Sequence, residues 1–90
     1  MSERTTKSMV LAQVDRLMKM LGGHWAKSFR DVGGWELDYN AIYGGYVIHT
    51  IYNEAGAVDA PFGDIRRNAR EMYDTIYFAM RVLKYEEKSQ

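Results

Sequence analysis

The clearest pattern of apolar and polar positions lies in the last third of the chain, from Asp64 to Leu83. Apolar side chains recur there at the i, i+4, i+7 spacing that places them on one stripe of an α-helix. The stripe contains Ile65, Ala69, Met72, Ile76, Ala79, Met80 and Leu83. Asp64 is a suitable N-cap, because its carboxylate can accept hydrogen bonds from the free amides of the first turn. We therefore predict a helix over residues 64–85 that packs one face on a core.

A second helical pattern occurs near the start of the chain, over residues 7–22. Its apolar stripe consists of Val10, Leu11, Val14, Leu17, Met18 and Leu21. Its candidate caps are Thr5, Thr6 and Ser8. The pair Gly22-Gly23 is expected to end the helix, because glycine adopts the left-handed conformation of a helix C-terminus at little cost. Residues 1–6 are expected to form a disordered tail.

Between the two helices the pattern changes to the period-two alternation that is typical of strands. Trp35, Leu37 and Tyr39 alternate with Glu36 and Asp38. Residues 46–52 are rich in β-branched and aromatic side chains, and residues 57–60 form a short third segment that ends before a proline. Glycine-containing turns separate the segments. We therefore predict a three-stranded meander over residues 35–60, and we interpret residues 24–34 as a loop over the edge of the core.

Together these elements predict an α+β fold of order α-β-β-β-α, in which a three-stranded antiparallel meander packs against two helices. A chain of 90 residues without a linker-like segment is expected to form a single domain over residues 1–90. Because a chain this short buries only a modest core, association into a homo-oligomer is a fair expectation.

Composition argues against several classes of function. The formal net charge is zero and there is no cysteine, so the chain lacks both a global charge that attracts nucleic acid or membranes and a thiolate metal site. No apolar run is long enough to span a bilayer, and the N-terminal residues do not resemble a signal peptide. We expect a cytoplasmic protein with no membrane partner.

Catalytic chemistry has little support in the sequence. The only histidines, His24 and His49, lie in different predicted elements, and no carboxylate is evidently placed to orient either one beside a nucleophile. The pair Gly44-Gly45 precedes a strand, whereas phosphate-binding loops precede a helix. The sequence therefore predicts no catalytic, cofactor-binding or metal-binding residue, and a protein that is not an enzyme.

Two surfaces are candidates for contacts with other proteins. Phe78 and Val82 lie nearly opposite the core stripe of the C-terminal helix, so we expect either another part of the chain or another molecule to cover them. Tyr43 and Tyr46 flank a predicted glycine turn in a tyrosine-rich segment, and tyrosine offers a large contact area with few rotatable bonds. An equally good interpretation is that these tyrosines line the sheet face beneath the helices.

Cationic and aromatic residues alternate along a further stripe of the same helix: Arg66, Arg70, Tyr73, Tyr77, Arg81 and Lys84. Such a row can stack on bases and neutralise phosphates. It is also typical of the rim of a core, where apolar stems are buried and polar tips are hydrated. Residues 31–65 contain carboxylates but no Lys or Arg, so the helix cations are also suited to pair with the sheet.

Three short motifs resemble a set of small, uncharacterised phage and prophage proteins. They are the Tyr-Gly-Gly-Tyr turn at residues 43–46, the glycine-containing turn at residues 53–56, and the helical run Ala-Arg-Glu-Met-Tyr at residues 69–73. The resemblance covers roughly residues 35–83. It implies an origin more than a mechanism, because that family carries no assigned activity.

The order of the elements is also similar to the double-stranded-RNA-binding domain. In that family a basic cluster that opens the second helix grips phosphates across a groove. The spacing of its Lys-Lys-x-Ala-Lys motif is matched by Arg66, Arg67, Ala69 and Arg70. The turn between the first two predicted strands departs from the family, because it is Gly-Gly and lacks the family's Gly-Pro-x-His motif.

We consequently expect a non-enzymatic phage-type accessory protein that binds a second copy of itself, as a homodimer, and an unidentified protein. Its candidate contact residues are Phe78, Val82, Tyr43 and Tyr46. The alternative function is a nucleic-acid-binding module. The candidate residues for that alternative are Arg66, Arg67, Arg70 and Lys84.

Overall fold

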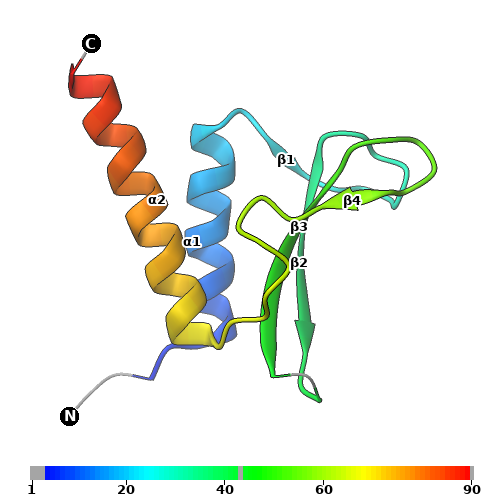
Figure 1. The fold of residues 1–90 in the computed structure, drawn as a ribbon, viewed down its shortest axis with the longest axis horizontal. Coiled ribbons are helices and arrows are strands. Elements are labelled where there is room, and N and C mark those ends of the chain that lie inside the picture. Colours follow the sequence, from blue (N-terminus) through cyan, green and yellow to red (C-terminus); the bar gives the residue numbers. More distant parts are fainter. Residues whose placement is uncertain (1–3, 43, 90) are drawn as a thin grey trace.

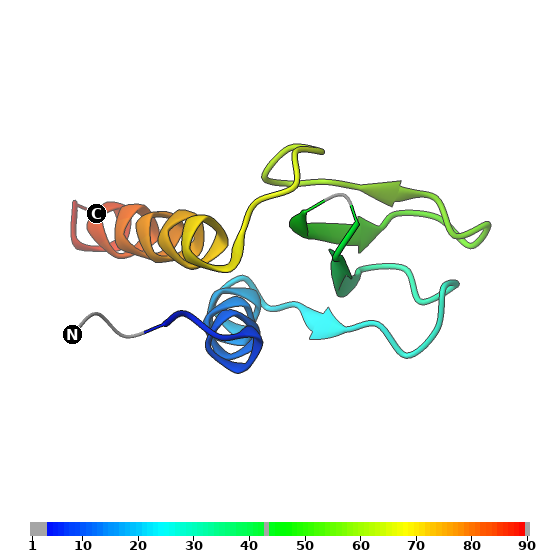
Figure 2. The same ribbon diagram turned by 90° about the horizontal axis from the view of Figure 1, so that it is seen from below.

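The computed structural model describes residues 4–42 and 44–89. In chain order its elements are α1 (Lys7–Met20), β1 (His24–Trp25), β2 (Gly34–Asn40), β3 (Gly45–Ile51), β4 (Val58–Asp59) and α2 (Ala69–Ser89). The strands form one sheet in the order β1-β2-β3-β4. Both helices lie on one face of this sheet and run in the same direction (Figure 1 and Figure 2). The predicted α+β class and the helix–sheet–helix order are confirmed.

Helix α1 begins and ends close to the predicted positions. Thr6, one of the candidate caps, accepts a 3.3 Å hydrogen bond from the Met9 amide, and Gly22 follows the last turn with a φ of 75°. The buried face of α1 is rotated around the helix axis relative to the predicted apolar stripe, because α2 packs beside α1. It includes Gln13, which is 3% exposed, whereas Leu11 at its other edge is 44% exposed. Neither helix of the described chain is long and apolar enough to cross a membrane.

The sheet contains one strand that the sequence analysis missed. Residues 24–34 were predicted as a loop, but the first two of them pair in parallel with the start of β2 and form β1. A two-residue strand leaves no periodicity in the sequence. It is tied to α1 by the Trp25 indole, which donates a 2.9 Å hydrogen bond to Asp15. The Lys19 ammonium, 2.8 Å from Asp15, and the Trp25 indole hold the pKa of that carboxyl below its ordinary value.

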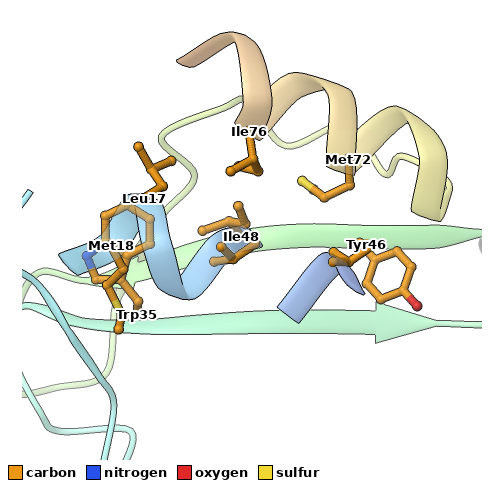
Figure 3. Close-up of a cluster of buried hydrophobic side chains, with 9 residues drawn as sticks. Leu17, Met18, Trp35, Tyr46, Ile48, Met72 and Ile76 are labelled. Atoms are coloured by element: carbon orange, nitrogen blue, oxygen red, sulfur yellow. The ribbon is translucent and has the colours of Figure 1, made fainter. Parts of the chain in front are cut away.

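The meander of β2, β3 and β4 is antiparallel, as predicted. Alternate residues of β2 and β3 point toward the helices and form the floor of the core. Figure 3 shows the side chains of both helices meeting this floor. The buried cluster consists of Val10, Val14, Leu17, Met18, Trp35, Tyr46, Ile48, Met72 and Ile76. The hydrophobic core therefore lies between one sheet face and the two helices.

Helix α2 begins at Ala69, and the prediction that Asp64 caps it is wrong. The N-cap is Asn68, whose side-chain oxygen accepts a 2.8 Å hydrogen bond from the Glu71 amide. The amide of Asn68 donates in return to the Glu71 carboxylate at 3.0 Å, which completes a capping box. Ile65, predicted in the buried stripe, lies outside the helix and is 69% exposed.

The helix starts late because the chain before it is held against the sheet. Tyr46 and Arg67 form an isolated antiparallel bridge, with hydrogen bonds of 2.7 and 3.0 Å between their backbones. A residue that exchanges both backbone hydrogen bonds with a strand is extended and cannot belong to a helix. Gly45, at the start of β3, allows this close approach because it has no Cβ and adopts a φ of 147°.

Gly45→Ala is expected to destabilise the fold more than the same change at the adjacent glycine. A Cβ at position 45 would overlap the carbonyl oxygen of Arg67 and lie 2.7 Å from its carbonyl carbon, whereas one at Gly44 meets nothing within 4 Å. Both glycines have a positive φ, so Gly44→Ala controls for backbone strain. We expect a loss of about 2 kcal/mol or more for Gly45→Ala and about 1 kcal/mol for Gly44→Ala, measured by urea unfolding. Equal losses would show that the bridge does not depend on Gly45.

A second pair of variants tests where α2 begins. Asn68→Ala removes the capping acceptor and should lower the free energy of unfolding by about 1 kcal/mol. Asp64→Ala should change it by less than about 0.5 kcal/mol, because the Asp64 side chain is 90% exposed and lies before the helix. Thermal and urea unfolding followed by circular dichroism measure both. A larger loss for Asp64→Ala than for Asn68→Ala would instead support a helix that begins near Asp64, as the sequence predicted.

Candidate functional site

Arg66, a candidate for nucleic-acid binding, is held against the sheet. Its guanidinium donates a 2.6 Å hydrogen bond to the Asp38 carboxylate and a 3.1 Å hydrogen bond to the Gly45 carbonyl. Asp38 lies on β2, directly opposite Val47 of β3. An arginine that reaches it from the outer edge of β3 must cross Val47, which is 2% exposed. The expected pairing of helix-proximal cations with the acidic sheet is confirmed at this residue.

The other candidate cations have partners or positions different from those of Arg66. Arg67 donates to the Ile65 carbonyl at 3.4 Å, and Arg70 forms a 3.2 Å ion pair with Asp74 on the next turn of α2. Lys84 is in the second half of α2, about 22 Å along the axis from its first residue at 1.5 Å per residue. Nucleic-acid binding stays a prediction.

The tyrosine-rich segment divides between the core and the surface. Tyr43 lies outside the described residues. Tyr46 is 5% exposed, its ring centroid lies 4.7 Å from that of Tyr39, and burial raises the pKa of its hydroxyl. Tyr46 is therefore a core residue and not an accessible contact residue. This agrees with the alternative interpretation, in which the tyrosine lines the sheet face beneath the helices. Tyr39 and Tyr52 remain 48% and 60% exposed.

Phe78 and Val82 lie on the open side of α2, as predicted. They are 64% and 61% exposed, so no described segment of the chain wraps over them. Tyr85, on the same side, is 74% exposed. The C-terminal half of α2 leans away from the sheet (Figure 1). We call this surface the α2 strip: Phe78, Val82 and Tyr85, with Glu71 and Glu86 at its two ends.

A groove of about 670 Å³ runs between α1 and α2. Its lining includes Arg16, Lys19, Met20, Tyr77, Met80 and Lys84. Among the described residues no carboxylate lines it, although Lys19 forms a 2.8 Å ion pair with Asp15 just outside the lining. The sequence analysis missed this groove, because the groove exists only where two helices distant in sequence meet. We call it the α1/α2 groove.

A smaller hollow lies beside β4, with a volume of about 360 Å³. His49 is in its lining, and its Nε2 lies 4.0 Å from the Asp64 carboxylate. Within residues 4–42 and 44–89, no three histidine, cysteine, aspartate or glutamate side chains gather closely enough to hold a metal ion. Among the described residues, the hollow therefore adds no candidate metal site to the α2 strip and the α1/α2 groove.

No protein-family model matches the chain, and comparisons with curated proteins and with solved structures also give no match. The candidate surfaces consequently rest on the geometry and chemistry of the chain itself.

A double-mutant cycle tests whether Arg66 supports the fold. Arg66→Ala should lower the free energy of unfolding by about 1–2 kcal/mol, because it uncovers Val47 as well as breaking the ion pair. The coupling energy between Arg66→Ala and Asp38→Ala should approach about 1 kcal/mol, the upper range for an incompletely buried pair. Arg70→Ala, which breaks only a surface pair, should cost less than about 0.5 kcal/mol. Zero coupling would show that the pair of Arg66 and Asp38 does not stabilise the fold.

Proposed function

We propose that this chain is a non-enzymatic, phage-type accessory protein that acts by binding protein surfaces, and that its first partner is a second copy of itself. The α2 strip is the observation that carries the proposal. Phe78 and Val82 expose nearly two-thirds of their surface on a helix whose opposite face already fills the core. A helix that is apolar on two sides needs two partners, and the described fold supplies only one of them.

The energetics favour a weak, concentration-dependent dimer. Burying a phenylalanine or valine side chain completely stabilises a complex by about 1.5–3 kcal/mol. Association must also offset lost translational and rotational freedom, which costs at least about 4 kcal/mol. Two partly exposed side chains on each copy only modestly exceed that cost. Since each copy has its own core, we expect folded monomers in equilibrium with dimers.

The origin and location in this proposal rest on sequence motifs. The Tyr-Gly-Gly-Tyr turn and the Ala-Arg-Glu-Met-Tyr run support a phage-type protein that works in the host cytoplasm. The unidentified protein partner would compete with the second copy for the same strip. No catalytic or cofactor-binding residue is assigned.

Replacing both strip side chains, Phe78→Ser with Val82→Ser, should weaken self-association by at least about tenfold while leaving the fold intact, because neither residue belongs to the core. Ile65→Ser is a matched control, since Ile65 is 69% exposed but lies outside α2. Sedimentation equilibrium over a wide range of protein concentration measures association, and circular dichroism verifies folding. A wild-type chain that stays monomeric throughout, or a double variant that dimerises normally, would reject the proposal.

A further inference from the structure

We infer that the α1/α2 groove of one copy receives the α2 strip of a second copy. This inference rests on the proposed self-association and names the two surfaces that meet in it. The strip and the groove lie on different sides of α2, so every chain carries one of each. Self-association through this contact therefore joins two unlike surfaces head to tail, and one such contact links two copies into a dimer.

Charge complementarity is the first argument for this pairing. The described lining of the groove contains the cations Arg16, Lys19 and Lys84 and no carboxylate. The strip carries Glu71 and Glu86, and the neighbouring Arg81 lies against Tyr77, with its guanidinium carbon 5.8 Å from the centroid of that ring. Lys19 is already paired with Asp15, so Arg16 and Lys84 supply most of the unbalanced positive charge. Arg16 donates a 3.3 Å hydrogen bond to Gln13, a neutral group that leaves this charge uncompensated.

The shapes of the two surfaces also correspond. Along α2 the groove lining extends from Tyr73 to Lys84, about 16 Å at 1.5 Å per residue. The apolar part of the strip, from Phe78 to Tyr85, covers about 10 Å by the same measure, and so fits within the length of the groove. The groove offers methionine and tyrosine side chains to the strip's aromatic and aliphatic anchors. Methionine adapts its shape to such anchors, and aromatic pairs add to the energy of area burial.

A contact between two strips is less favourable than this arrangement. It would bring the carboxylates of both copies onto one surface without a cation to balance them, and like charges at an interface repel. Insertion of the strip into the groove instead brings the carboxylates of one copy toward a surface that carries Arg16 and Lys84. The same insertion covers the apolar groove lining, which a contact between two strips leaves open to water.

Two charge-changing variants test the inference. The groove variant is Arg16→Glu with Lys84→Glu. The strip variant is Glu71→Gln with Glu86→Lys, in which the glutamine amide retains an acceptor for the capping hydrogen bond from Asn68. The strip variant still has a basic groove, and the groove variant still has an acidic strip. In a mixture, a contact between these two retained surfaces, or between the two altered ones, joins opposite charges, whereas each variant alone brings like charges together.

We expect each variant alone to self-associate at least about tenfold more weakly than the wild type, and an equimolar mixture to recover association through heterodimers. Sedimentation velocity measures the association, native mass spectrometry identifies the heterodimers, and circular dichroism verifies folding. Lys27→Glu with Arg30→Glu makes the same change in net charge as the groove variant, on the exposed loop between β1 and β2, and should leave association unchanged.

The outcomes separate this inference from the proposed function. If the wild type dimerises and Phe78→Ser/Val82→Ser abolishes the dimer, but the groove variant dimerises normally, the proposed function stands and the groove is not the receptor. Failure of the mixed variants to associate, with both folded, also overturns the inference. A wild type that is monomeric at every concentration rejects both.

Discussion

The backbone bridge between Tyr46 and Arg67 is the constraint on which the placement of α2 depends. It holds the chain extended along β3 until Asn68, so the helix begins at Ala69 and rises from the edge of the sheet. It also positions Arg66 to reach across β3 toward Asp38. Gly45 makes the bridge possible, because any larger residue would collide with the Arg67 carbonyl. A single glycine thus decides where the longest helix starts and which of the neighbouring cations is engaged by the sheet.

Once α2 is placed, its surfaces have distinct surroundings. Met72 and Ile76 enter the core against β3 and α1 (Figure 3), and the next side of the helix lines the groove shared with α1. The remaining side carries Phe78 and Val82, which stay 64% and 61% exposed. The proposed self-association follows from this division, because the same helix presents both an apolar strip and one wall of a groove.

The zero net charge conceals a local separation of charges that shapes both the fold and the proposed contact. Within the chain, cations are paired with carboxylates at Arg66–Asp38, Lys19–Asp15 and Arg70–Asp74. Lys84 and Arg16 instead face the groove, whose described lining includes no carboxylate. The cations that the sequence places in one row along the helix therefore have different surroundings. This distribution explains why the two helices together form a basic recess.

The sequence by itself determined the helices, the meander and the side of α2 that carries Phe78 and Val82, because these depend on periodicity over many residues. It misplaced the start of α2, since a good capping residue at Asp64 is a local signal that the bridge to Tyr46 overrides. It missed β1, which is two residues long, and left Tyr46 open between surface and core. Only the tertiary structure decided these points and formed the α1/α2 groove, because each depends on contacts between residues that are far apart along the chain.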